Sequence, residues 1–192
     1  MVLSTEQLKP LSDVIGHLSP TEQQYLNFGN AVVHVVGDRY VSYVVAHANV
    51  DQAWSVLTDY DNFAQFLPSV ESSRVLESEG DRAVVEQIAG LKVLFADMKS
   101  RVCTENIKTP KERIDFRLLE GDLKMMEGHW QLIPVKNDEL KGQDSQPIAV
   151  IKQAVRVEVG NPLLEGAFEA VYIKNMKRNL MAIAREARNR QG

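Results

Sequence analysis

The feature that most constrains the fold of this chain is a series of short β-rich runs that occupies residues 70–159. Turn-forming residues such as Gly80, Pro110 and Gly121 separate the runs at regular intervals. Runs joined by such tight turns are typical of an antiparallel meander, in which neighbouring strands pair in sequence order. We therefore expect one antiparallel sheet over this region.

A long helix is predicted to follow the sheet. Asn161 can cap it and Pro162 suits its first turn, and neither glycine nor proline occurs between Gly166 and Gly192. Before the sheet, residues 50–67 change to helical spacing and predict two short helices, because an Asp-Tyr-Asp sequence interrupts the pattern. Pro68 is expected to end the second one.

The N-terminal part of the chain predicts further short elements. Ser19 and Glu22, with Pro20 at the first helical position, form the pattern of a capping box and a helix start. The apolar side chains of this helix are expected to dock on a core: Tyr25, Leu26 and Phe28. Two β-rich runs around Gly37 then predict a hairpin.

These elements predict an α+β fold of one domain. A curved antiparallel sheet would wrap around the long C-terminal helix, with the two short helices after the first strand, because this arrangement buries all the apolar faces. We assign residues 1–30 to a helical extension and residues 31–192 to the domain, and expect residues 92–106 to form one strand. Gly128 would leave a gap in the side-chain layer, and so curved a sheet is difficult to fill, which predicts an internal apolar cavity.

Two stretches carry a resemblance to a known family. Residues 46–78 combine a strand, a tryptophan-bearing short helix, an aspartate-tyrosine link and an aromatic helix ending in proline, and residues 116–134 contain a glycine-aspartate turn before a strand with a spaced glycine and tryptophan. In this order they resemble the START-like (SRPBCC, helix-grip) superfamily, in its polyketide cyclase/dehydrase and coenzyme-Q-binding-like branch, over about residues 39–190. Ala64 stands where many relatives have proline.

The resemblance implies a hydrophobic tunnel between sheet and terminal helix. Across the superfamily this tunnel serves lipids, sterols, quinones, polyketides and hormones, in binders and enzymes alike. The candidate ligand-binding residues are large apolar side chains, each of which could equally be plain core: Trp54, Phe66, Phe95, Phe116, Met126, Trp130, Phe168, Tyr172 and Met176. Flexible methionines suit a pliant cavity wall.

The charge of the chain is unevenly distributed. Residues 163–192 hold six basic and three acidic residues, a net charge of +3, whereas the remainder carries −7. Five cations fall on one arc of the predicted terminal helix, away from its apolar stripe: Lys174, Lys177, Arg178, Arg185 and Arg188. This arc is either a solvated outer face or a surface that docks to anionic lipid head groups or RNA phosphates. DNA binding is not expected.

Enzyme chemistry has little support in the sequence. The four histidines are scattered without metal-ligand spacing, Cys103 has no nearby histidine, and we predict no metal site and no cofactor. Either Glu86 or Gln87 would point into the cavity, depending on strand phase, and a buried carboxyl there could act as an acid.

The leading hypothesis is binding or transport of a hydrophobic small molecule, a lipid or isoprenoid quinone, in the internal cavity. A polyketide aromatase/cyclase or dehydratase is one alternative, and it would need an acid or base poised in the cavity. The other is a module that contacts a ribosome or protein through the basic helix, as the resemblance to ribosome-association toxins allows. With no signal peptide or span of about 20 apolar residues, we expect a cytoplasmic protein, with possible peripheral membrane contact.

Overall fold

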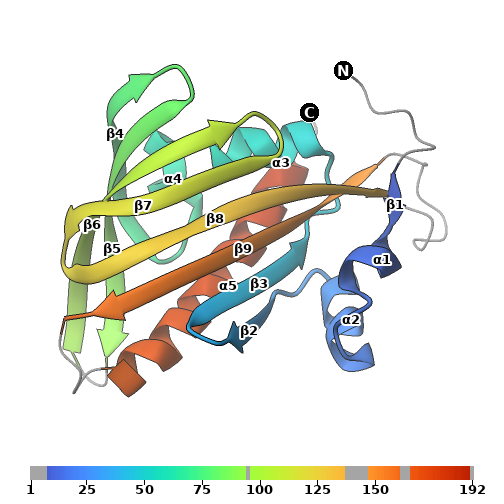
Figure 1. The fold of residues 1–192 in the computed structure, drawn as a ribbon, viewed down its shortest axis with the longest axis horizontal. Coiled ribbons are helices and arrows are strands. Elements are labelled where there is room, and N and C mark those ends of the chain that lie inside the picture. Colours follow the sequence, from blue (N-terminus) through green and yellow to red (C-terminus); the bar gives the residue numbers. More distant parts are fainter. Residues whose placement is uncertain (1–7, 94–95, 137–146, 161–164, 191–192) are drawn as a thin grey trace.

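The computed structural model describes residues 8–93, 96–136, 147–160 and 165–190 of the chain. An antiparallel sheet in the order β2-β3-β9-β8-β7-β6-β5-β4 curves around the C-terminal helix α5 (Glu165–Asn189) (Figure 1). The strands are β2 (Val32–Val36), β3 (Arg39–Val45), β4 (Val70–Glu79), β5 (Arg82–Val93), β6 (Ala96–Thr109), β7 (Arg113–Gly121), β8 (Leu123–Lys136) and β9 (Ile148–Val159). The short β1 (Lys9–Pro10) pairs with β8 in parallel. The predicted helix-grip architecture is confirmed.

The turn at Gly121 shows how local chemistry sets the register of the sheet. Gly121 has φ +147°, and a Cβ there would collide with the backbone of Arg101. The carboxylate of Asp122 accepts a hydrogen bond of 2.6 Å from the backbone N–H of Arg101. This contact fastens the β7–β8 turn to β6, next to a register shift between Cys103 and Thr104.

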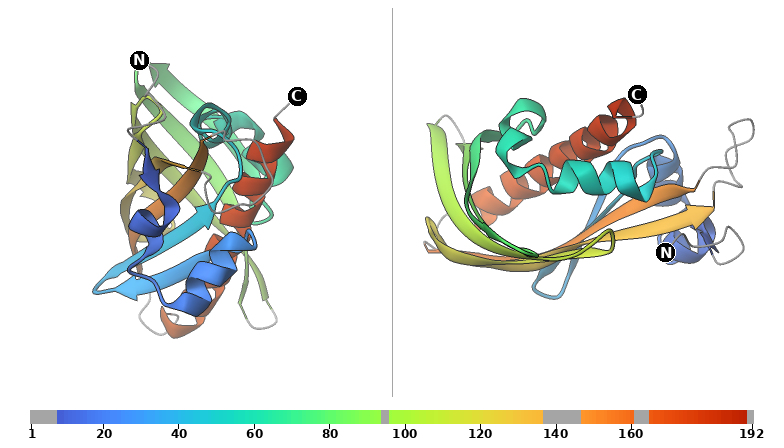
Figure 2. Two further views of the ribbon diagram at one scale, coloured as in Figure 1. Left: turned by 90° about the vertical axis from the view of Figure 1, so that its right-hand side faces the viewer. Right: turned by 90° about the horizontal axis from the view of Figure 1, so that it is seen from above.

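Short helices close the concave side of the sheet beside α5. Helix α3 (Val50–Leu57) begins with a reciprocal capping box, in which Asn49 and Gln52 bond each other's backbone N–H at 2.9 and 2.8 Å. The 3₁₀ turn η2 (Tyr60–Asn62) and helix α4 (Phe63–Phe66) follow. Figure 2 shows these elements lying with α5 on the inner side of the sheet.

Two separate cores lie on the two faces of the sheet. The inner core lies between the concave face, α5 and the short helices, and includes Ile114, Ile151 and Leu180. The outer core lies where α1 (Leu11–Ile15) and α2 (Pro20–Asn27) pack on the convex face. The N-terminal segment therefore covers apolar residues of β3, β8 and β9. The division between residues 1–30 and 31–192 stays a prediction.

Helix α2 begins at the predicted capping box of Ser19 and Glu22, but only part of its predicted docking is correct. Leu26 is fully buried, whereas Tyr25 is 56% and Phe28 75% exposed. The prediction was wrong for these two aromatic residues because α2 lies at the surface and turns only one side toward the sheet.

Three further predictions concern the strand over residues 92–106, the gap at Gly128 and the start of the terminal helix. Residues 92–106 belong to two strands, since β5 ends at Val93 and β6 begins at Ala96, so the single predicted strand was wrong. The gap expected at Gly128 is occupied by the ring of Phe116, its direct partner on β7. The predicted helix start at Asn161 and Pro162 lies outside the described residues.

Candidate functional site

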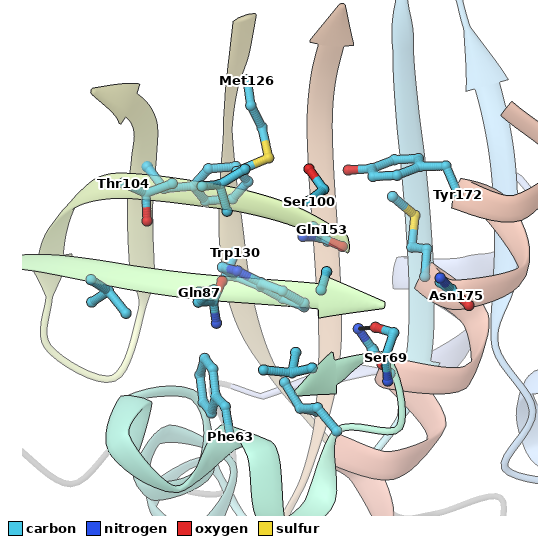
Figure 3. A pocket seen from close by; sticks show the side chains of 18 of the residues that line it. Phe63, Ser69, Gln87, Ser100, Thr104, Met126, Trp130, Gln153, Tyr172 and Asn175 are labelled. Atoms are coloured by element: carbon cyan, nitrogen blue, oxygen red, sulfur yellow. Dashed lines mark hydrogen bonds between the residues drawn. The ribbon is translucent and has the colours of Figure 1, made fainter. Parts of the chain in front are cut away.

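A cavity of about 210 Å³ lies between the concave face of the sheet and α5 (Figure 3). Strands β4 to β9, α5 and the short helices all contribute side chains to its wall. A void that holds one water needs only about 10–15 Å³ on this scale. The inner core is therefore hollow at its centre, with room for a small organic molecule.

Six of the nine predicted ligand-binding residues line this cavity, and two others lie elsewhere in the inner core. The six lining residues are Phe116, Met126, Trp130, Phe168, Tyr172 and Met176. Phe95 lies outside the described residues. Whether a ligand touches any of these side chains stays a prediction.

Trp54 and Phe66 pack against the inner core but do not line the cavity. The guanidinium of Arg190 lies 5.7 Å from the centre of the Phe66 ring and donates a hydrogen bond of 2.6 Å to Asp59. Arg190 also binds the backbone oxygen of Ser55 at 3.0 Å. These contacts join the end of α5 to the short helices, so Phe66 belongs to a structural junction.

The polar part of the cavity wall consists of neutral groups. Among the described lining residues none is an aspartate, glutamate, lysine, arginine or histidine. The polar lining side chains, apart from Trp130, are amides and hydroxyls: Tyr60, Ser69, Gln87, Ser100, Thr104, Asn106, Gln153, Tyr172, Asn175 and Asn179. Apart from Tyr172, and Gln87 as one of two alternatives on its strand, the sequence analysis did not select them. The residue spacing could have found three of them. Gln153 falls on the same strand face as the apolar Ile151 and Val155, and Asn175 and Asn179 are one turn apart on one side of α5.

Some of these polar groups bond one another and hold the cavity wall together. Asn179 donates a hydrogen bond of 2.6 Å to the hydroxyl of Ser69, and Asn106 donates one of 3.0 Å to the hydroxyl of Thr104. Asn175 reaches the backbone oxygen of Gly90 at 3.5 Å. The asparagines of α5 thereby connect the helix to the turn before β4 and to β5.

The titratable groups among the described lining residues are two tyrosines. Burial raises the pKa of Tyr60 to about 12. Burial, with a contribution from Tyr40, also raises the pKa of Tyr172. Both hydroxyls are therefore protonated at neutral pH and act as uncharged hydrogen-bonding groups.

The structure decides the strand phase of β5. Gln87 lines the cavity, and Figure 3 shows its side chain on that side of the strand. Glu86 lies on the opposite face and accepts hydrogen bonds of 2.7 Å from Arg101 and 2.8 Å from Arg74, which hold its pKa below the usual range. The hypothesis of a buried acid at Glu86 was therefore wrong.

The basic arc predicted on the terminal helix is an exposed surface. Its five members are Lys174, Lys177, Arg178, Arg185 and Arg188, which we call the basic face. Within the described part of the chain none of them forms an ion pair. From Lys174 to Arg188 the face extends about 21 Å at 1.5 Å per residue.

Other candidate chemistry is sparse in the residues that the structure describes. They contain no group of three His, Cys, Asp or Glu side chains that could hold a metal ion. The thiol of Cys103 is buried, which raises its pKa and lowers its reactivity. None of the described helices is long and apolar enough to cross a membrane.

Comparisons with known proteins agree with this geometry. The family model "Polyketide cyclase / dehydrase and lipid transport" matches residues 46–184. Ribosome association toxin RatA of Escherichia coli K12 is 27% identical over 133 residues, which cover 69% of this chain and 75% of the toxin.

Solved structures share the fold. A START superfamily protein from Mycobacterium smegmatis matches with a TM-score of 0.62 and 16% identity, covering 81% of this chain and 99% of that protein. The Zhui aromatase/cyclase from Streptomyces sp. R1128 matches with a TM-score of 0.59 and 21% identity, covering 83% and 94%. At this identity the likeness concerns the fold alone.

Proposed function

This chain belongs to the polyketide cyclase/dehydrase and lipid transport family, and from that premise we propose that it binds or carries a hydrophobic small molecule, such as a lipid or isoprenoid quinone. The observation that carries the proposal is the hollow inner core. Its wall is mainly apolar, with neutral amides and hydroxyls between the apolar side chains. Apolar burial would supply the binding free energy, at about 25 cal/mol per Å² before association costs are subtracted.

Native mass spectrometry of protein purified from its own source tests this proposal. We expect a stoichiometric molecule that organic solvent extracts. Ala89 lines the cavity, so Ala89→Trp should fill it and abolish co-purification while the circular dichroism spectrum is unchanged. Ala170→Trp, at an exposed position of α5, is the matched control and should retain the molecule. Repeated absence of any bound molecule, together with failure to bind added apolar probes, would contradict the proposal.

The enzyme alternative, a polyketide aromatase/cyclase or dehydratase, finds less support in the cavity. Proton transfer is most effective from groups whose pKa lies near the working pH. The titratable groups among the described lining residues are Tyr60 and Tyr172, and the pKa of each is raised away from neutrality. Turnover of an extracted metabolite by the purified protein would favour this alternative over simple binding.

The basic face supports a second candidate function, association with a ribosome. Unpaired cations over about 21 Å of one helix can follow a phosphate backbone, and relatives of this chain are named ribosome association toxins. A cytoplasmic location is part of this proposal. Such contact needs no cavity ligand, so the two functions can be tested separately.

Co-sedimentation with ribosomes at increasing salt tests the second candidate. Replacing Lys174, Lys177 and Arg178 together by glutamine should abolish pelleting at low salt. The triple replacement of Lys99, Lys111 and Lys124 removes the same charge from elsewhere on the surface and should not. Equal behaviour of both triple variants would contradict the proposal, and binding to anionic vesicles instead would assign the face to a membrane surface.

A further inference from the structure

Several polar side chains of the cavity wall make no hydrogen bond to the described part of the protein, and three of them carry an N–H donor. Within the described part of the chain, the indole N–H of Trp130 and the carboxamides of Gln87 and Gln153 make no hydrogen bond. Their polar atoms are also not sealed among protein atoms, unlike the hydroxyl of Tyr60. They therefore face the open space of the cavity and remain available to whatever occupies it.

Two of these groups are direct neighbours on the sheet. Trp130 of β8 pairs with Gln153 of β9 in the antiparallel register, which brings their Cβ atoms to about 5 Å. Figure 3 shows both side chains at the cavity, with Gln87 extending from β5 toward the same space. Together they offer N–H donors from three groups and carbonyl acceptors from two.

The charges nearest to these groups in the sequence point away from the cavity. Glu86, beside Gln87, is held by two arginines on the convex face. Lys152, beside Gln153, lies over the ring of Tyr43, which belongs to the outer core. Since none of the described lining residues is charged, an ionised group inside the cavity would lose its hydration without gaining a counter-ion.

From this arrangement we infer that the cavity selects an uncharged ligand that carries a carbonyl or hydroxyl oxygen, and that Trp130 and Gln153, with Gln87, anchor this oxygen. The inference rests on the proposed ligand-binding function and adds its specificity. A ligand carbonyl accepts hydrogen bonds from the indole and carboxamide N–H groups, and a ligand hydroxyl can also donate to a carboxamide oxygen. Fatty acid carboxylates and phosphate head groups are rejected.

Three probes of the same bicyclic skeleton test this selection by calorimetric titration at pH 7. Acetylnaphthalene carries an uncharged ketone, ethylnaphthalene lacks oxygen, and naphthoate carries a charge, all at one ring position. The ketone should bind about tenfold more tightly than the hydrocarbon, as one or two net hydrogen bonds provide. Naphthoate should bind at least about 100-fold more weakly than the ketone, because its charge has no partner.

Variants then identify the anchor. Trp130→Phe keeps an aromatic ring without its N–H, and Gln153→Leu keeps similar volume without the amide. In each variant the ratio of ketone to hydrocarbon affinity should fall toward one, and this ratio cancels any general change in the cavity. Gln131→Leu, at the neighbouring β8 position whose side chain points to the other face, is the matched control and should keep the ratio.

The outcomes separate this inference from the proposed function. If the hydrocarbon binds as tightly as the ketone, or if the variants leave the ratio unchanged, the anchor is wrong while the hydrophobic cavity still binds guests. Naphthoate binding equal to that of the ketone would also overturn it. If none of the three probes binds, the proposed ligand-binding function itself fails.

Discussion

The two faces of the same strands differ in the kind of polar group that they carry. On the convex face, Glu86 lies between Arg101 and Arg74, and Glu105 lies between Arg82 and Arg117 at 2.7 Å from each. On the concave face, the next residues along the strands are neutral, as Gln87 and Thr104 show. At these points of β5 and β6, adjacent residues thus change from a paired charge on one face to an uncharged group on the other.

This difference agrees with the inference that the cavity selects uncharged ligands. Charged pairs near solvent retain much of their hydration and cost little. A charge inside a largely apolar cavity requires a partner, whereas a neutral amide needs only a hydrogen bond that a ligand or water can supply. Substitutions that place a charge on the concave side, or remove a charge from the convex face, test this contrast.

The largest effect is expected from a charge placed in the inner core. Ile114 is 1% exposed, and Ile114→Lys would bury an unpaired ammonium group, which should cost more than about 4 kcal/mol and leave little folded protein. Chemical denaturation of the soluble fraction measures it. Asp115→Asn, on the opposite face of the same strand, should cost under about 1 kcal/mol. Similar losses in both would contradict the comparison.

Adding a side chain at Gly128 should have the next largest effect. A Cβ there would collide with the backbone of Ala154 and Val155 on β9 and with the ring of Phe116. Gly128→Val should therefore lower the free energy of unfolding by about 3 kcal/mol, measured by urea titration. Gly166→Ala, where a Cβ meets open space on a helix, should be neutral or stabilising by up to about 1 kcal/mol. A well-folded Gly128→Val would mean that the strands adjust easily.

A smaller effect distinguishes neutral groups of the cavity wall that hydrogen-bond to the protein from those that do not. Asn179→Ala removes the partner of the Ser69 hydroxyl and should cost about 1–2 kcal/mol in thermal or urea unfolding. Gln87→Leu removes an amide without a protein partner and should change stability by less than about 0.5 kcal/mol. A large loss from Gln87→Leu would show that its amide has a structural role and is not reserved for a ligand.

The smallest effect at neutral pH concerns the carboxylates of the convex face. The pKa values of Glu86 and Glu105 are lowered by hydrogen bonds from their arginines. Their contribution to stability is therefore complete above the unfolded pKa of about 4.3 and is lost as the pH falls through the lower folded pKa. Unfolding of the Glu86→Gln, Glu105→Gln double variant, followed from pH 7 to 3, should approach the parent at acid pH. A constant difference would contradict this.

Much of the fold could be predicted because its signals are local. The capping box at Ser19 and the turn at Gly37 depend on residues a few positions apart. The boundary between β5 and β6 was missed because no glycine, proline or asparagine marks residues 91–98. Strand phase was also open, since a shift of one residue exchanges Glu86 and Gln87 between the faces.

The candidate site was predictable only in part. Large apolar side chains such as Phe116 and Trp130 line the cavity, but Trp54 and Phe66 have the same sequence character and pack elsewhere. Gln87 was considered only as an alternative to Glu86, and the other neutral amides were overlooked, because a polar residue in a strand gives no indication of which other strands face it. Gln87, Trp130 and Gln153 come from three strands that the chain brings together only by curling.

By itself, the sequence determined the helix-grip architecture, the basic face of the terminal helix and the positions of several caps and turns, because hydrophobic period and capping act over a few residues. The sequence also predicted a cavity, but the tertiary structure alone decided its size and that its described wall carries no charge. Both properties depend on which faces of distant strands meet across α5, and on how far their side chains fill the space between them. That is a matter of sheet curvature and packing over the whole domain.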